Sequence, residues 1–113
     1  MENLFKALSD GNRLRILHLL THRELCVCEI EEILETTQSN ASRHLLKLKH
    51  AGVISSTKKA QWVYYHLSAD FAGSHSLLHQ YLKGIFESEE IYRRDLEALD
   101  AFVDTRQSCK TLA

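Results

Sequence analysis

The sequence contains no proline and only four glycines among its 113 residues. Proline breaks the interior of a helix and glycine weakens it, so this composition favours helices over β-sandwiches and excludes a collagen-like repeat. No internal repeat or low-complexity run is present. A chain of this length is expected to form one domain with a modest core, covering residues 1–113.

Long apolar runs are also missing. No stretch approaches the roughly 18 apolar residues of a membrane span, so we expect no membrane partner. The chain begins with Met1-Glu2-Asn3, without the basic-then-apolar pattern of a signal peptide, and a cytoplasmic location is expected. In that compartment its three cysteines, Cys26, Cys28 and Cys109, are expected to be reduced thiols.

Acidic side chains are absent between residues 36 and 69, although the net charge of the whole chain is −1. The basic residues of this stretch are Arg43, Lys47, Lys49, Lys58 and Lys59. The net charge alone argues against a nucleic-acid binder. A basic middle segment between acidic ends, however, is the charge pattern expected of a protein that binds a polyanion such as DNA. Chance clustering of five charges is the alternative explanation.

The stretch from residue 36 to residue 54 has the pattern of a DNA-recognition helix. Thr37 can cap its start, and Gly52 can end it in the left-handed conformation. Ala41, Leu45 and Leu48 recur at helical spacing and predict one apolar face. The opposite face then carries Ser39, Arg43, Lys47 and His50. A solvated amphipathic helix with no partner remains the alternative.

Two helices are expected before this stretch, over residues 2–8 and 12–20, with Ser9-Asp10 as the start signal of the second. Arg13 lies in the first turn of the second helix, where free N–H groups could meet a phosphate. A further short helix over residues 29–34 and a turn lead into the recognition helix. Two short helices joined by a tight turn predict a helix-turn-helix.

A β-hairpin is expected after Gly52, with strands over residues 53–57 and 62–67 that are rich in β-branched and aromatic residues. Its polar turn, residues 58–61, places two lysines at the tip, as in a wing that lies over the DNA backbone. An apolar stripe then runs from residue 77 to residue 103 on one long helix or two shorter ones. The stripe exceeds what a small domain can cover, so a homodimer is expected.

Four segments of the first 70 residues, in order and spacing, resemble the ArsR/SmtB family of winged-helix metal-sensing repressors. They are residues 8–17, 24–30, 38–45 and 62–67. The resemblance implies a mainly α winged helix-turn-helix with a small β-hairpin, and a homodimer that binds double-stranded operator DNA and releases it on binding a metal or metalloid. The face pattern and the resemblance together predict DNA contacts from Arg13, Gln38, Ser39, Asn40, Ser42, Arg43, His44, Lys47, Lys58, Lys59 and Gln61.

The segment from Glu24 to Ile30 looks like the arsenic- and antimony-sensing branch, which implies As(III) or Sb(III) as inducer and no organic cofactor. That branch often has a third cysteine three residues after the second, where this chain has Glu31. The N-terminal cysteines of the cadmium/lead sensors and the helix motif of the zinc sensors are not found. His75 and His79 could hold a metal at their i, i+4 spacing, but without added carboxylates we disfavour such a site.

Cys26 and Cys28 carry the sensing hypothesis, because thiolates select soft ions. Residues i and i+2 of a regular helix point about 200° apart, so sharing one ion requires an extended helix start. Binding there is expected to disturb the helix that supports the recognition helix, and the helix dipole is expected to lower the thiol pKa. A third sulfur could come only from Cys109, of the same or the other subunit.

Several alternatives stay open. The two cysteines could be small buried apolar residues, or all three could form disulfides in a redox sensor. Another soft metal (cadmium, lead or zinc) could be the inducer. An enzyme is disfavoured because no catalytic motif is present. A winged helix used only for protein contacts is disfavoured by the lysines and arginine on the expected DNA side.

Overall fold

The computed structural model describes residues 2–105. Their elements in chain order are α1 (Glu2–Leu8), α2 (Gly11–His22), β1 (Leu25–Cys26), α3 (Val27–Leu34), α4 (Gln38–His50), β2 (Ile54–Lys59), β3 (Trp62–Leu67), α5 (Ala69–Ser74), α6 (Ser76–Ser88) and α7 (Glu90–Asp104). In this part of the chain, no helix has the length and apolarity required to cross a membrane.

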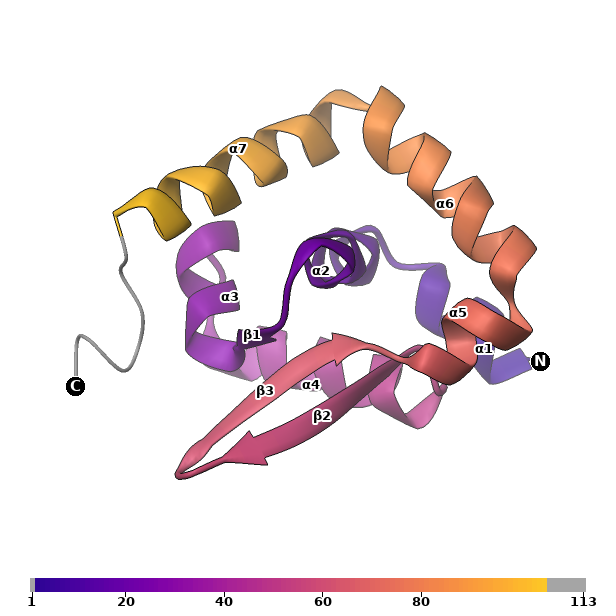
Figure 1. Cartoon of the computed structure of the whole chain (residues 1–113), viewed down its shortest axis with the longest axis horizontal. Helices are drawn as coiled ribbons and strands as arrows, with labels where there is room; N and C mark the ends of the chain where they lie inside the picture. Colours follow the sequence, from indigo (N-terminus) through magenta and orange to yellow (C-terminus); the bar gives the residue numbers. More distant parts are fainter. Residues whose placement is uncertain (1, 106–113) are drawn as a thin grey trace.

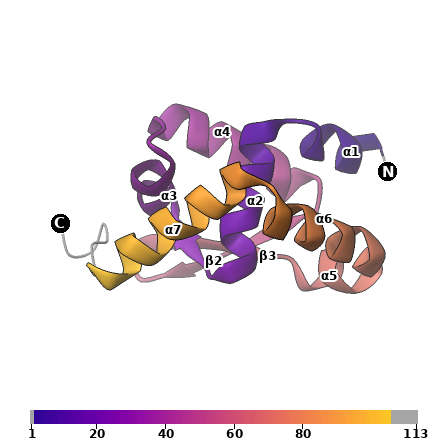
Figure 2. The same cartoon turned by 90° about the horizontal axis from the view of Figure 1, so that it is seen from above.

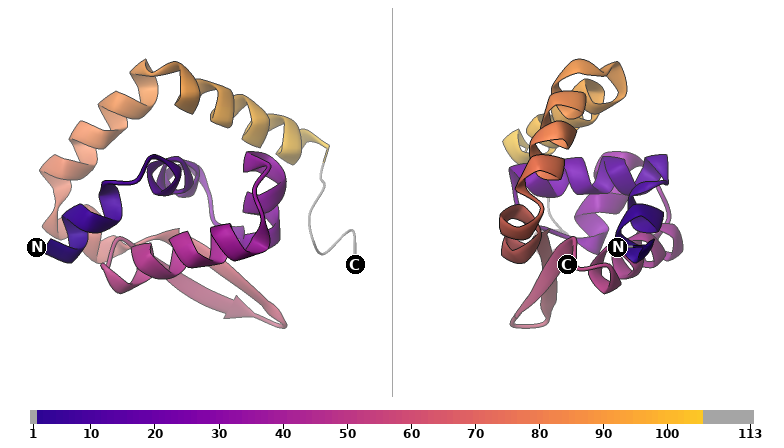
Figure 3. Two further views of the ribbon diagram at one scale, coloured as in Figure 1. Left: turned by 180° about the vertical axis from the view of Figure 1, so that it is seen from behind. Right: turned by 90° about the vertical axis from the view of Figure 1, so that its right-hand side faces the viewer.

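Helix α2 lies in the middle of the molecule (Figure 1). On one side α6 and α7 form an arch over it, and on the other side lie α4 and the sheet. Seen from above, α7 crosses α2 and runs towards α3 (Figure 2). The hairpin of β2 and β3 extends away from the arch, as the side view shows (Figure 3). The surface around α4 and the hairpin is therefore open to a large partner.

The local signals in the sequence act as expected at the helix ends. The side chain of Asp10 accepts from the backbone N–H groups of Asn12 and Arg13, and the side chain of Thr37 accepts from that of Asn40. The Ser68 hydroxyl accepts from Phe71 at the start of α5. Gly52 follows α4 with a φ of 78°, the left-handed conformation that glycine adopts without steric cost.

The sheet has three antiparallel strands in the order β1-β3-β2. In the hairpin, Ile54 lies opposite Leu67 and Lys59 opposite Trp62, so both lysines belong to β2 rather than to the turn. The third strand, β1, was not predicted. It places Leu25 opposite Tyr65 and Cys26 opposite Tyr64, which joins the segment before α3 to the hairpin.

The core confirms the predicted fold class, mainly helical with a small antiparallel sheet in a winged helix-turn-helix. Ala41, Leu45 and Leu48 of α4 are buried, as the apolar face predicted. The apolar stripe from residue 77 to residue 103 lies on two helices, α6 and α7, which was one of the two expected arrangements, and the short helix α5 precedes them. Arg15 of α2 makes two 2.8 Å hydrogen bonds to the carboxylate of Asp95, and this pair fixes α7 to the centre of the molecule.

Candidate DNA-binding surface and cysteine site

The outer face of α4 presents polar and basic side chains to solvent. Arg43 lies near the middle of this face, where one of its terminal nitrogens donates to the Asn40 side-chain carbonyl at 2.9 Å. This bond extends the guanidinium along the helix surface and leaves other N–H groups for a base edge or a phosphate. The predicted contacts that are exposed on α4 are Gln38, Ser39, Asn40, Ser42, Arg43 and Lys47.

His44 does not belong to this face, although the prediction included it. Its residue is only 7% exposed, because it lies three positions after Ala41 and so faces inwards with the apolar residues. The Nη1 of Arg13 lies 3.3 Å from its Nδ1. Burial lowers the pKa of His44; nearby Asp10 opposes this, and Arg13, Arg43 and Lys47 reinforce it. A direct contact of this ring with DNA is therefore at odds with its position.

The Arg13 side chain likewise bonds to groups within the protein, whereas the prediction gave it a contact with a DNA phosphate. Its Nε donates to the carbonyl of Ala7 at 2.7 Å, and its Nη2 donates to that of Lys6 at 3.2 Å. The N–H groups at the start of α2 are already bound by the Asp10 carboxylate. An anion at this helix start would meet that carboxylate, which disfavours the predicted phosphate contact there.

The wing carries its predicted contacts in exposed positions. Lys58, Lys59 and Gln61 all lie at the outer end of the hairpin. Lys59 forms an ion pair with Glu24, the residue just before β1, and its Nζ lies 5.2 Å from the centre of the Tyr64 ring. Sequence reasoning missed this role of Glu24, because the pair depends on the fold of two distant segments.

Cys26 and Cys28 lie at the point where β1 becomes α3, and their sulfur atoms are 3.7 Å apart. Cys26 has an extended backbone, with φ −90° and ψ 167°, so the two side chains escape the opposed directions of a regular helix. The backbone N–H of Cys26 donates to the Glu29 side chain at 2.9 Å. Two thiolates bound to one tetrahedral ion at about 2.3 Å lie about 3.8 Å apart, so this spacing suits a shared soft ion once both residues are reduced thiolates.

The two sulfurs differ in their surroundings. Cys26 is 3% exposed, whereas Cys28 is only partly buried. Burial raises the pKa of the Cys26 thiol, because the thiolate loses hydration there. The expectation that the helix start lowers this pKa is therefore wrong for Cys26. Binding of an ion at this sulfur has to drive off a firmly held proton.

A third ligand is not provided by the residues that the structure describes. Among residues 2–105, no group of three or more histidine, cysteine, aspartate or glutamate side chains is placed to hold a metal ion. This also leaves His75 and His79 without the added carboxylates of a metal site. Cys109, the predicted third sulfur, lies outside the described residues.

Comparison with known proteins agrees with this geometry. A family model described as bacterial regulatory protein, arsR family, matches residues 10–56. The arsenic resistance transcriptional regulator ArsR2 of Pseudomonas putida is 34% identical over 94 residues, which are 82% of this chain and 79% of that protein. The cadmium resistance regulator CadC homolog of Staphylococcus aureus is 33% identical over 85% of this chain and 72% of that protein.

Other matches are closer in sequence but shorter. The regulator ArsR1 of Pseudomonas putida is 46% identical over 57% of this chain, and the match spans only 51% of that protein. The first curated relatives are thus matched over about half to two thirds of their length. Reduced HlyU from Vibrio cholerae N16961 has a TM-score of 0.59 and 39% identity, over 70% of this chain and 84% of that one.

A homodimeric winged helix-turn-helix domain, Mb0332 of Mycobacterium bovis, superposes with a TM-score of 0.64 at 28% identity, covering 79% of this chain and 83% of that one. The matched family is one of regulatory proteins, which agrees with the expectation of a regulator rather than an enzyme. Together, the ArsR2 and CadC-homolog matches, the structural neighbours and the shared winged helix show that this chain belongs to the arsR family of bacterial regulatory proteins.

Proposed function

We propose that this protein is a transcriptional repressor that binds operator DNA as a homodimer and releases it when trivalent arsenic or antimony binds the sulfurs of Cys26 and Cys28. The observation that carries the proposal is the 3.7 Å separation of these sulfurs at the start of α3, beside the DNA-binding surface. The names of the relatives support a metal or metalloid inducer, since they include arsenic and cadmium resistance regulators.

In this proposal α4 enters the major groove, and the wing follows the backbone beside it. Ser39 and Arg43 suit base edges, because hydroxyl and guanidinium groups donate to the acceptors of the major groove. Lys47, Lys58 and Lys59 suit phosphates, which accept charge-assisted bonds from any sequence. The absence of acidic residues between positions 36 and 69 limits repulsion at this surface to acidic residues of neighbouring segments, such as Glu24 beside Lys59.

The cysteine site has two routes to the DNA-binding surface. Cys26 is the N-cap residue just before α3, and α3 packs directly against α4. Cys26 also ends β1, where it lies opposite Tyr64 of the wing strand β3. When an ion binds the two sulfurs and recruits a third ligand, the backbone at this junction has to adjust, and both the recognition helix and the wing are attached to it. A coupling free energy of about 1–3 kcal/mol is typical for such linked sites.

The soft-ion preference follows from the ligands. Thiolates favour As(III), Sb(III), Cd(II) and Pb(II) over hard cations, so the sulfur pair alone does not select among them. We favour arsenic and antimony because the segment from Glu24 to Ile30 resembles that branch. A third sulfur from Cys109, in the same or the other subunit, would complete a three-coordinate site.

The test is release of an operator duplex, followed by fluorescence anisotropy, on titration with arsenite, antimonite, cadmium and zinc. The unaltered protein is expected to release DNA with arsenite or antimonite at the lowest concentration. Cys26→Ser and Cys28→Ser are expected to bind DNA normally but to resist release, because each loses a ligand. The matched control is Ser55→Ala, a similar small change in the wing, which should leave release unchanged.

Two results would contradict this proposal. Normal release from both serine variants would remove the sulfur pair from the sensing mechanism. Release by cadmium or zinc at concentrations where arsenite has no effect would show that another metal is the inducer. For Cys109→Ser, an unchanged stoichiometry of arsenite would exclude Cys109 as the third ligand.

Thiol oxidation is a second candidate signal, favoured by the same 3.7 Å separation and by the likeness to reduced HlyU. Two thiols that form a disulfide lose two protons and two electrons to an oxidant, and peroxide is reduced to water. The sulfurs would have to approach to about 2.05 Å. DNA release by peroxide, with loss of two hydrogens from a peptide containing Cys26 and Cys28, would favour this signal over a metalloid.

A further inference from the structure

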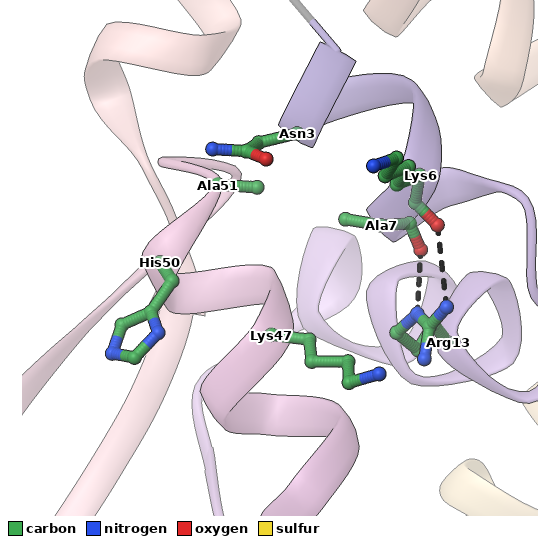
Figure 4. A pocket seen from close by; sticks show the side chains of 7 residues that line it. All are labelled: Asn3, Lys6, Ala7, Arg13, Lys47, His50 and Ala51. Atoms are coloured by element: carbon green, nitrogen blue, oxygen red, sulfur yellow. Dashed lines mark hydrogen bonds between the residues drawn. The ribbon is translucent and has the colours of Figure 1, made fainter.

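A hollow of about 310 Å³ lies between α1 and the C-terminal half of α4. Its lining includes three exposed basic side chains, Lys6 from α1 and Lys47 and His50 from α4, beside the exposed Asn3. Figure 4 shows the Lys47 side chain extending from α4 towards Arg13 at the back of the hollow. Two of these three groups are ammonium ions, and none of the lining residues carries a carboxylate.

The back of the hollow is a fixed scaffold. Arg13 donates to the carbonyl oxygens of Ala7 and Lys6 at the end of α1, which holds α1 against α2 (Figure 4). These bonds also use the acceptors that would otherwise reduce the positive potential of the hollow. Ala7 itself is buried, so the position of Lys6 relative to α4 is set by packing.

The hollow adjoins the proposed DNA surface. Lys47 follows Ser39 and Arg43 at intervals of four residues, so all three project from one side of α4. A duplex that lies along this side would pass the mouth of the hollow with its backbone. A phosphate group carries one negative charge and accepts several hydrogen bonds, which suits two ammonium groups and an imidazole.

We propose that this hollow binds a backbone phosphate of the operator duplex, held between Lys6 and Lys47, with His50 as a further donor. The inference rests on the proposed DNA-binding function and adds α1 to the surface that touches DNA. Its role is to set the position of α4 in the groove without reading sequence. Lys6 was outside every predicted contact set, because only the fold brings residue 6 beside residue 47.

The test compares Lys6→Ala with Lys49→Ala, which alters an exposed lysine on the opposite side of α4 from Lys47. Operator binding is measured at several salt concentrations. Loss of one phosphate contact lowers the slope of log affinity against log salt by about 0.9, or about 1.8 for a homodimer. Lys6→Ala is expected to show this decrease and to weaken operator and unrelated duplexes by the same factor. Lys6→Arg is expected to keep the slope.

An unchanged slope for Lys6→Ala, or an equal decrease for Lys49→Ala, would overturn the inference. The comparison with Arg43→Ala separates this failure from that of the proposed function. If Arg43→Ala weakens operator binding and Lys6→Ala does not, only the inference fails; if the unaltered protein binds no duplex, both fail. Binding of inorganic phosphate that depends on Lys6, with an unchanged DNA slope, would identify a small-anion site and would also overturn the inference.

Discussion

His18 places a titratable ring inside the core. The residue is 2% exposed, and its ring centre lies 4.9 Å from that of Phe86 and 5.4 Å from that of Tyr92. Burial lowers its pKa to about 4; the neighbouring His22 adds to this, and Asp95 opposes it. The ring is therefore neutral at physiological pH, and it takes up a proton more readily in the unfolded chain than in the folded one.

This difference predicts sensitivity to acid. Because the folded pKa lies below the ordinary value of 6.5, the contribution of His18 to stability is complete above about pH 6.5 and is lost as the pH falls towards 4. The loss over that range is about 3 kcal/mol. In His18→Leu, the free energy of unfolding by urea is expected to change less between pH 7 and pH 4.5. His50→Gln, an exposed control, should keep the unaltered pH dependence; an equally steep dependence in His18→Leu would contradict the assignment.

Single residues were predictable where a local signal decides their role. The caps at Asp10 and Thr37 depend on neighbours in sequence, and both were predicted correctly. The inward position of His44 could also have been predicted, since His44 lies three residues after Ala41 and shares the helical period of the apolar face. The hydrogen bonds of the Arg13 side chain could not be predicted from the sequence, because their acceptors are carbonyl oxygens of another helix.

Among the elements, β1 shows what sequence alone could not provide. A two-residue strand has no periodicity of its own, and it exists because β3 offers a partner about 40 positions later. The same strand explains how two cysteines at i and i+2 meet, since Cys26 is extended while Cys28 is helical. The cysteine pair could therefore be predicted by type and position, but its geometry required a long-range contact.

The contact between β1 and the wing leads to a prediction about DNA affinity. Glu24 holds the ammonium of Lys59 and brings a negative charge close to the expected path of the backbone. Exposed ion pairs stabilise proteins by about 1 kcal/mol or less, so Glu24→Gln should fold normally. It is expected to bind the operator about 3-fold more tightly at low salt, because Lys59 is released and one repulsive charge is lost. The measurement is anisotropy at low salt.

The control for this effect is Glu32→Gln, which removes an equal charge from an exposed position on α3. It should leave the affinity close to that of the unaltered protein. Weaker binding by Glu24→Gln would show that the ion pair orients the wing for DNA binding. The explanation that Glu24 competes with the DNA for Lys59 would then be wrong.

At the scale of the whole molecule, the arrangement separates two surfaces. The wing and α4 lie on one side of α2, and the arch of α6 and α7 lies on the other (Figure 3). Leu82 and Phe86 of α6 cover the core, but Leu77 and Tyr81 are 80% and 66% exposed. Phe5 of α1 is 56% exposed and lines a hollow together with the start of α6. Apolar side chains exposed together in this way suit a contact with a second copy.

This surface gives the last prediction. Tyr81→Glu places a charge in the proposed dimer contact, where an unpaired charge is costly to bury, and is expected to give the mass of one chain in light scattering. Its affinity for a two-half-site operator should fall by about 100-fold or more, because the two recognition helices then bind independently. Lys83→Glu, an exposed charge change about 200° around α6 from Tyr81, should remain dimeric. A dimeric Tyr81→Glu with unchanged operator affinity would place the subunit contact elsewhere, and the exposed residues of α1 and α6 would then need another partner.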